Sequence, residues 1–257
     1  MSVEEVAARL QASGVENARS EAAWLFERLT GADLELAVQR RCEGYPLQYL
    51  LGEWDFYRQT YEVGEACLIP RADTEILVEK GISLLPEGAR FLDLCTGSGC
   101  IAISTLCERA DATGVAVDLF AHTLALAERN AVRNGVADRL TFLRADVLQP
   151  PPAFLEPESF DAIFSNPPYI RTEVMPTLQK EVQYEPAAAL CGGEDGLDFY
   201  RAILKKWQTV LKKDGFILFE IGYDQGVELC ALGAAHGYRT AVYKDYGGND
   251  RVVLLKR

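Results

Sequence analysis

Apolar and polar positions follow a helical rhythm in the first part of the chain. Apolar side chains recur at helical intervals between Ala22 and Leu29. Ser2 and Glu5 have the spacing of a capping box, which predicts a helix that begins directly after Ser2. A further helix is expected to begin with Asp33 as its N-terminal cap. We therefore predict a small helical domain at this end of the chain.

The pattern changes after Gly44, where glycines and a proline interrupt the helical rhythm. The segment from Trp54 to Ile69 is rich in aromatic and β-branched residues, which are typical of strands. We expect this segment to form a β-hairpin that links two domains. The chain then divides into a helical domain over residues 1–52, a linker over 53–72 and a larger domain over 73–257.

From about Arg71 onward, apolar strand-like runs alternate with helical stretches, which is typical of an α/β fold with a parallel sheet. The expected strands are Arg90–Cys95, Gly114–Asp118, Leu140–Ala145, Asp161–Ser165, Phe216–Ile221, Tyr238–Lys244 and Arg251–Lys256. Only residues 245–250 separate the last two runs, too few for a crossover helix, so these runs should pair antiparallel. The larger domain is therefore predicted to be a seven-stranded, Rossmann-like sheet.

A glycine-rich turn follows the first of these strands, in the sequence Asp93-Leu94-Cys95-Thr96-Gly97-Ser98-Gly99. Glycines let the backbone approach a ligand closely, and open α/β sheets bind cofactors at the carboxyl ends of their strands. The turn therefore indicates a nucleotide-like cofactor. Its glycine spacing also fits a dinucleotide fingerprint with Asp118 as the downstream acid, so a nicotinamide dehydrogenase stays open here.

Three aspartates near the ends of successive strands favour S-adenosylmethionine over a dinucleotide. Asp93, two residues before the turn, would attract the ammonium and sulfonium groups of S-adenosylmethionine and repel a pyrophosphate. Asp118 can accept from both ribose hydroxyls of either cofactor, and Asp146 is placed to accept from the exocyclic amine of adenine. The alternative is that each aspartate only caps a helix or a turn.

The sequence Asn166-Pro167-Pro168-Tyr169 follows the fourth strand and is the most specific signal in the chain. Because the prolines fix the backbone, the Asn166 side-chain oxygen and the Pro167 carbonyl form a rigid pair of acceptors, which suits an NH₂ group with two donors. Tyr169 offers a flat face to a planar group. An amide or amino-purine nitrogen can thus be aimed at a methyl group without a metal or a strong base. The alternative is a proline-rich loop without such a role.

Composition and charge narrow the partners and the surroundings. The 257 residues carry a formal net charge of −12, which opposes binding to a phosphate backbone, so direct contact with nucleic acid is not expected. No secretion signal or membrane-spanning run is visible, which indicates a cytoplasmic protein. The seven cysteines form no Cys-x-x-Cys pair and are accompanied by only two histidines, so reduced cysteines and no metal site are expected.

Taken together, these motifs resemble those of the HemK (PrmC) family of protein-(glutamine-N5) methyltransferases, over nearly the whole length of the chain. The matching stretches are Pro46–Gly52, Leu68–Arg71, Thr74-Glu75, Asp93–Gly99, Asn166–Tyr169, Glu185-Pro186, Gly192-Gly193 and Phe219–Gly222. The resemblance implies a class I methyltransferase domain that uses S-adenosylmethionine, and a helical N-terminal domain that helps to recognise the partner. It also implies a class I peptide-chain release factor as substrate, methylated on the glutamine of its Gly-Gly-Gln motif, with a monomer as the default state.

The resemblance and the residue patterns together define a candidate site. The candidate cofactor contacts are Asp93, Cys95, Thr96, Gly97, Ser98, Gly99, Asp118, Asp146, Val147 and Asn166. The candidate substrate contacts are Arg71, Glu75, Asn166, Pro167, Pro168 and Tyr169, with Asn166, Pro167 and Tyr169 as the catalytic residues. A salt bridge at the hinge is the alternative role for Arg71, Thr74 and Glu75. Glu220, at the end of the fifth strand, could hydrogen-bond within the site, but a helix cap is the plainer role, and Glu220 is not counted among the catalytic residues.

Two positions depart from the commonest family pattern. Cys95 stands where glycine is frequent, a replacement that should cost little at the end of a strand. Val147 stands where an aromatic residue often covers the adenine, so cofactor affinity is the property that this replacement is expected to affect.

Other functions compete with this interpretation. A close relative of the family methylates a glutamine of a ribosomal protein by the same chemistry. A DNA adenine-N6 methyltransferase shares the Asn-Pro-Pro-Tyr sequence, but no target-recognition domain is visible and the net charge is unfavourable. The remaining alternatives are a cofactor-binding adaptor without activity, which the intact Asn166 and Tyr169 argue against, and a dehydrogenase, for which no hydride-positioning residue is evident.

Overall fold

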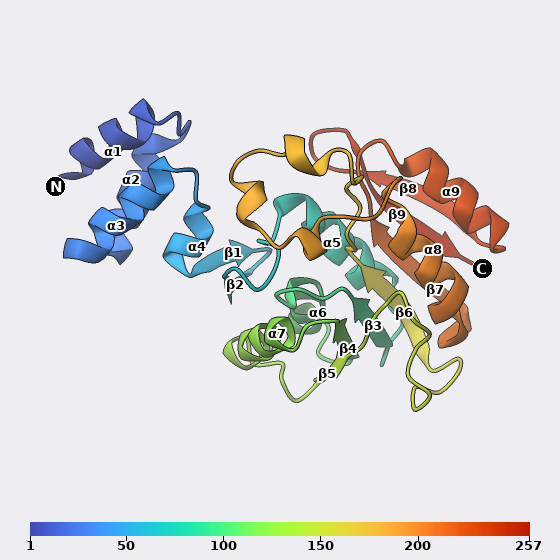
Figure 1. Cartoon of the computed structure of the whole chain (residues 1–257). Coiled ribbons are helices and arrows are strands. Elements are labelled where there is room, and N and C mark those ends of the chain that lie inside the picture. The colour runs from blue at the N-terminus through green and yellow to red at the C-terminus, as the bar shows by residue number, and fades with distance from the viewer.

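The computed structural model describes all residues from Met1 to Arg257, and Figure 1 shows a small helical body joined to a larger α/β body by a hairpin. The small body contains helices α1 (Val3–Ala12), α2 (Ala18–Arg28), α3 (Gly31–Cys42) and α4 (Leu47–Leu51). Its core is formed by apolar residues from all four helices, among them Val6, Leu10, Leu25, Val38 and Leu47. Burial of this shared apolar stripe holds the four helices together.

The two predicted helix starts have different outcomes. The capping box is confirmed, because the Glu5 amide donates to Ser2 Oγ at 3.2 Å and the Ser2 amide donates to Glu5 Oε2 at 2.7 Å. The prediction that Asp33 caps the next helix is wrong. Thr30 already has the extended backbone of a cap and α3 begins at Gly31, so Asp33 lies in the first turn, where its charge complements the helix dipole.

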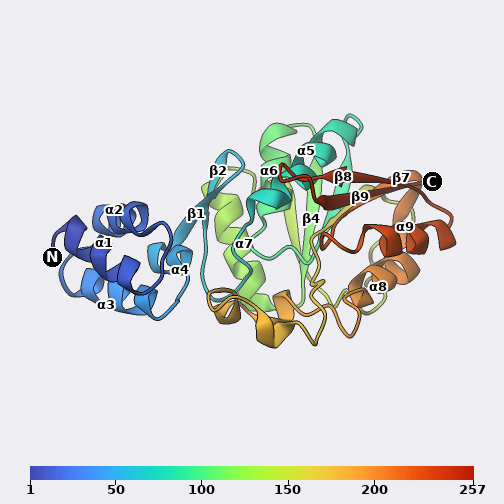
Figure 2. The ribbon, with the colours of Figure 1, turned by 90° about the horizontal axis from the view of Figure 1, so that it is seen from above.

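A two-stranded hairpin joins the helical body to the rest of the chain, as Figures 1 and 2 show. Strand β1 (Glu53–Phe56) pairs antiparallel with β2 (Gln59–Glu62) across a tight turn in which Tyr57 has a φ of 57°. The Tyr57 amide donates to Glu75 Oε1 at 2.8 Å, which ties the turn to the start of helix α5 (Glu75–Leu84). The hairpin is thus fastened to the larger body at its turn.

The larger body contains a seven-stranded sheet in the order β5-β4-β3-β6-β7-β9-β8. The strands are β3 (Arg90–Leu94), β4 (Thr113–Asp118), β5 (Leu140–Arg144), β6 (Phe160–Ser165), β7 (Leu211–Glu220), β8 (Arg239–Lys244) and β9 (Asp250–Lys256). The predicted seven strands and the antiparallel pairing of the last two are confirmed. Strand β7 begins earlier than predicted because a register shift between Phe160 and Ala162 lets Leu211 pair with Phe160.

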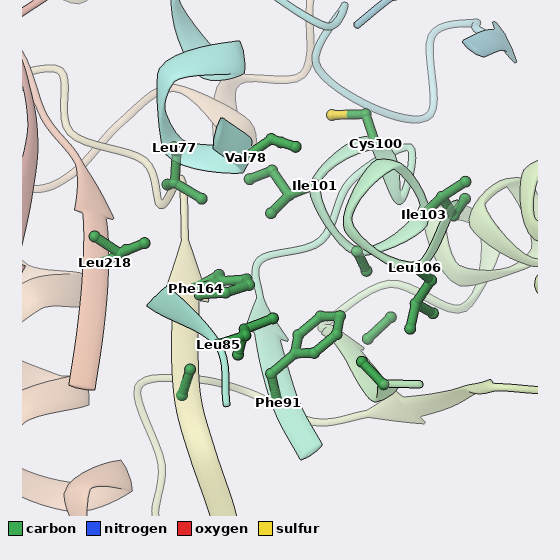
Figure 3. Packing of buried hydrophobic residues seen from close by; sticks show 14 of the residues in the cluster. Leu77, Val78, Leu85, Phe91, Cys100, Ile101, Ile103, Leu106, Phe164 and Leu218 are labelled. Atoms are coloured by element: carbon green, nitrogen blue, oxygen red, sulfur yellow. The ribbon is translucent and has the colours of Figure 1, made fainter. Parts of the chain in front are cut away.

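Helices cover both faces of the sheet (Figure 2). Helices α5, α6 (Cys100–Glu108) and α7 (Ala121–Arg133) lie on one face, and α8 (Asp198–Lys206) and α9 (Gly226–Ala235) lie on the other. Side chains alternate between the faces along each strand, so Phe91, Phe164 and Leu218 pack under α5 and α6, as Figure 3 shows. From β3 the chain continues to β4 and β5 on one side, whereas from β6 it continues to β7 on the other side. Open α/β sheets bind ligands at such a reversal, in the crevice at the carboxyl ends of the two central strands.

The residues between β6 and α8, here called the β6–α8 segment (residues 166–197), contain short 3₁₀ turns and no longer helix. This segment contacts the helical body through an ion pair between Arg41 and Glu181 at 2.8 Å. The rings of Tyr45 and Tyr184 also meet there, with centroids 5.2 Å apart. The segment therefore bridges the two bodies beside the carboxyl ends of the strands. No helix in the protein has the length and apolar character needed to traverse a lipid bilayer.

Candidate active site

A cavity of about 700 Å³ opens at the carboxyl ends of β3, β4, β5 and β6. Ten of the predicted site residues line it: Arg71, Cys95, Thr96, Gly97, Ser98, Asp118, Asp146, Val147, Asn166 and Pro168. Five predicted residues lie outside its wall: Glu75, Asp93, Gly99, Pro167 and Tyr169. The glycine turn and the Asn-Pro-Pro-Tyr sequence therefore face one continuous space, although they follow different strands.

The glycine turn has three residues in the left-handed region, which are Cys95 with a φ of 62°, Gly97 with 56° and Gly99 with 81°. A Cβ atom on Gly99 would lie 2.9 Å from Ile103 Cδ1 and 3.2 Å from Ala127 Cβ, so a side chain there would collide with α6 and α7. The expectation that cysteine in place of glycine at position 95 costs little stability is wrong. A residue with a side chain in this backbone region is strained by about 1–2 kcal/mol.

Asp93 lies beneath the glycine turn and is completely buried. Its Oδ2 accepts from the Thr96 hydroxyl at 2.6 Å and from the Ala102 amide at 3.3 Å, while Oδ1 has no partner. Burial raises the pKa of Asp93 to about 7, although these two hydrogen bonds oppose the shift. Within the protein this carboxyl group shapes the turn, and one of its two oxygens is buried without a hydrogen-bond partner.

Asp118 and Asp146 border the cavity and also support its turns. Asp118 ends β4, and its carboxylate accepts from the Gly97 amide and the Phe120 amide, each at 3.1 Å. Burial raises the pKa of Asp118. Asp146 follows the end of β5, and its Oδ1 accepts from the Leu148 amide at 2.8 Å. Both acids therefore cap turns, as the alternative interpretation proposed, and both remain on the cavity wall.

Phe120 is a residue of the cavity that the sequence reasoning missed. It directly follows the Asp118 turn, lines the cavity and is 38% exposed. Val147 lies on the same wall but is only 4% exposed, and it packs into the core beneath the sheet. An aromatic ring is thus present in the cavity wall, contributed by the second residue after β4 instead of the residue after Asp146.

The Asn-Pro-Pro-Tyr sequence is held in place by its neighbours. Asn166 Nδ2 donates to the Thr74 hydroxyl at 3.3 Å, and the Tyr169 carbonyl accepts from Gln225 Nε2 at 3.1 Å. A Cβ atom on Gly192 would lie 2.6 Å from the Pro168 carbonyl oxygen, so only glycine fits there. The Tyr169 side chain packs into the core outside the cavity wall, and burial raises the pKa of its phenol.

Glu220 is a second residue that the sequence reasoning misplaced. The prediction that it caps a helix is wrong, because the next helix, α9, begins at Gly226. Glu220 ends β7, is 1% exposed, and its Oε2 has no partner. Burial raises its pKa to about 7, against the hydrogen bonds from Thr74 and Asn166 and the charge of Arg251. A buried carboxyl group thus lies directly beside Asn166.

Arg71 and Glu75 have different surroundings. Arg71 lines the cavity and pairs with Glu185, which is buried and also accepts from the Ile69 amide at 2.9 Å. The expected salt bridge at the hinge therefore exists for Arg71, with a partner in the β6–α8 segment. Glu75 instead accepts from the Tyr57 amide in the linker hairpin, so its place in the substrate pocket stays a prediction.

Fold and cavity define a class I S-adenosylmethionine-dependent methyltransferase, and comparisons with known proteins agree. The profile of the "Methyltransferase small domain" family matches residues 72–190. A structure of ribosomal protein L11 methylase from Lactobacillus delbrueckii subsp. bulgaricus shares the fold, with a TM-score of 0.54 and 20% identity. The alignment covers 76% of this chain and 83% of the methylase chain.

Two bacterial relatives are similar over nearly their full length. The release factor glutamine methyltransferase of Agrobacterium fabrum is 38% identical over 288 residues, covering 100% of this chain and 97% of the relative. The protein of the same name from Geobacter sulfurreducens is 38% identical over 265 residues, covering 95% and 91%. The chain belongs to the family of release factor glutamine methyltransferases, and its methyl donor is S-adenosylmethionine. This membership favours the methyltransferase interpretation over the dehydrogenase and the inactive adaptor.

Proposed function

We propose that the protein transfers a methyl group from S-adenosylmethionine to the side-chain amide nitrogen of the glutamine in the Gly-Gly-Gln motif of class I peptide-chain release factors. The observation that carries this proposal is the position of Asn166, which lines the same cavity as the glycine turn while its amide NH₂ group is engaged by Thr74. The side-chain oxygen is thereby left to accept a hydrogen from the substrate amide. The names of the relatives support the choice of substrate.

The cofactor is proposed to bind along the glycine turn. When bound, S-adenosylmethionine supplies a methyl group activated by its sulfonium sulfur. The residues present fit it. Thr96, Gly97 and Ser98 line the cavity, Asp118 would accept from the ribose hydroxyls, and Asp146 would accept from the adenine amine. The unpartnered oxygen of Asp93 adds a negative potential behind the turn when that carboxyl group is ionised.

The substrate side is proposed to work by alignment. The Asn166 oxygen would accept one hydrogen of the glutamine amide, and the carbonyl of Pro167, which lies between the wall residues Asn166 and Pro168, would accept the other. Tyr169 helps to keep this turn rigid through its contacts in the core. Holding an amide nitrogen at near-attack distance contributes on the order of several kcal/mol to lowering the barrier. Arg71 and Pro168 complete the wall on this side of the cavity.

The setting of the reaction is proposed from charge and composition. The net charge of −12 disfavours a nucleic-acid substrate. We propose that the protein acts as a cytoplasmic monomer that contacts its release factor without contacting nucleic acid directly. Part of that contact would be made by the helical body of residues 1–52, which adjoins the β6–α8 segment beside the cavity.

The test is methyl transfer from labelled S-adenosylmethionine to a purified class I release factor. We expect label on the wild-type factor and none on a factor whose Gly-Gly-Gln glutamine is changed to alanine. Asn166→Ala should abolish the label. Asn249→Ala, in the exposed turn between β8 and β9, is the matched control and should keep it. Equal labelling of both release factors would refute the proposed acceptor.

A further inference from the structure

Two polar side chains end adjacent strands of the sheet and point to the same face. In the pairing of β6 with β7, Ser165 lies opposite Phe219, so the next residues, Asn166 and Glu220, are also neighbours. Because side chains alternate along a strand, Glu220 points to the face of Leu218, which packs under α5 in Figure 3. Thr74, at the start of α5, lies on that face and contacts both side chains.

These three side chains lie together in a small buried cluster. Asn166 Nδ2 donates to Thr74 Oγ1 at 3.3 Å, and the Glu220 carboxyl group lies near enough to Thr74 and Asn166 for their donor groups to lower its pKa, while its Oε2 has no hydrogen-bond partner. Thr74 is 2% exposed and Glu220 is 1% exposed, so water is largely kept out. A hydroxyl group has one hydrogen to donate, and an ionised carboxylate can only accept. An ionised Glu220 therefore presents only acceptors to the Thr74 hydroxyl and the Asn166 amide.

We propose that Glu220 is a positioning residue that sets which way the Asn166 side-chain amide faces. This inference rests on the proposed function, in which the Asn166 oxygen accepts from the substrate amide. With Glu220 as acceptor, the Asn166 NH₂ group turns towards Glu220 and Thr74, and the Asn166 oxygen turns towards the cavity. Without that acceptor, the two ends of the Asn166 amide are nearly equivalent in shape, and the amide can rotate.

Protonation of Glu220 should reverse this preference. A protonated carboxyl group donates one hydrogen, which allows it to bond the Asn166 oxygen and leaves the Asn166 NH₂ group facing the NH₂ group of the substrate. The two NH₂ groups are both donors, so no hydrogen bond could form between them. The titratable and charged groups that act on Glu220 or feel its charge are Asp73, Cys100, Tyr169, Tyr200 and Arg251. Arg251 favours the ionised form, although it is shared with Asp73 at 3.2 Å and Asp245 at 3.0 Å.

The experiment compares kcat at saturating S-adenosylmethionine and release factor between about pH 5 and about pH 9, where such a group titrates. The wild-type enzyme should lose activity as the pH falls through neutrality. In Glu220→Gln the side chain keeps its shape but cannot change its charge. This variant should therefore lack the fall in activity at low pH, here called the acid limb of the profile. Its kcat above neutral pH should fall about tenfold, with KM for the release factor changed less than about twofold. Glu228→Gln, on the exposed start of α9, is the matched control and should keep the wild-type profile.

A second variant separates positioning from a general loss of structure. Glu220→Asp keeps the charge but withdraws it by one methylene group, so it should keep the acid limb at a lower kcat. A purely structural role would lower activity equally at every pH in both variants, and that result would overturn the inference. It is also overturned if Glu220→Gln retains the wild-type kcat and acid limb, or, should that variant not fold, if Glu220→Asp retains the wild-type kcat. Absence of methyl transfer by the wild-type enzyme would instead refute the proposed function.

Discussion

Gly192 lies so close to the Asn-Pro-Pro-Tyr sequence that a methyl group cannot be added without moving it. A Cβ atom there would lie 2.6 Å from the Pro168 carbonyl oxygen and 2.7 Å from Tyr169 Cα, whereas ordinary contact begins at 3.4 Å. In Gly192→Ala the backbone must therefore yield by about 0.8 Å. Backbone atoms cannot rotate away as a flexible side chain can, so the shift should pass to the tetrapeptide that contains Asn166.

A displacement of this size near a reacting group lowers the rate by about 10- to 100-fold, or about 1.4–2.7 kcal/mol in activation free energy. Overpacking should also lower the free energy of unfolding by about 1–3 kcal/mol. Affinity for S-adenosylmethionine should fall less than kcat, because most candidate cofactor contacts follow other strands and only Asn166 belongs to the tetrapeptide. We would measure kcat by methyl transfer, cofactor affinity by calorimetry and stability by urea unfolding.

The control is Gly64→Ala, a position with an ordinary φ and no atom within 4 Å of the added Cβ. It should leave kcat and stability close to wild type. If Gly192→Ala retains kcat within about twofold of the wild-type value, the tetrapeptide does not need the rigid backing that we assign to Gly192.

Three further predictions concern the cofactor side of the cavity. Cys95→Gly should be more stable than Cys95→Ala by about 1 kcal/mol in urea unfolding, because the φ of 62° strains any side chain; a more stable alanine variant would refute this strain. Phe120→Ala should weaken S-adenosylmethionine binding about tenfold by calorimetry, while Phe154→Ala on an exposed loop should not; equal affinities would remove Phe120 from the site. Burial raises the pKa of Asp93 from 3.8 to about 7, so the folded state binds its proton more tightly and loses stability as the pH rises through this range. The free energy of unfolding of Asp93→Asn, relative to wild type, should therefore increase from about pH 4 to above pH 7, and a constant difference would contradict the raised pKa.

The fold was largely predictable because its strands are short apolar runs with clear boundaries. Strands β3 to β6 begin and end within one residue of their predicted limits, and the final hairpin follows from the short connection before Asp250. The start of β7 was not predictable, because it depends on the register shift opposite Phe160. Helix α3 was misjudged because Thr30 and Asp33 are both good caps, and the sequence alone does not rank them.

The cavity was predictable where a residue's position along a strand determines where its side chain goes. The glycine turn, Asp118 and Asn166 directly follow or end parallel strands, so they meet at one edge of the sheet. Asp93 shows the limit of this reasoning. It shares the face of Phe91, so its side chain lies beneath the turn and outside the cavity wall.

The missed residues depend on contacts between segments that are far apart in the sequence. Glu220 and Thr74 meet only because α5 packs across the ends of β6 and β7, although alternation with Leu218 already indicated an inward direction for Glu220. Gly192 was matched only as part of a family stretch, and its packing against Pro168 requires the folded β6–α8 segment. Phe120 carried no signal of its own, because an aromatic residue at the start of a helix is usually a packing residue.

The most direct test of the central claim is a competition for the methyl group. A class I release factor, ribosomal proteins and DNA would be presented together with the enzyme and labelled S-adenosylmethionine, and the labelled product would be digested and mapped by mass spectrometry. We predict a single methyl group on the glutamine of the Gly-Gly-Gln motif and no label on the other components. Label on a ribosomal protein or on DNA, with none on the release factor, would contradict the proposed substrate.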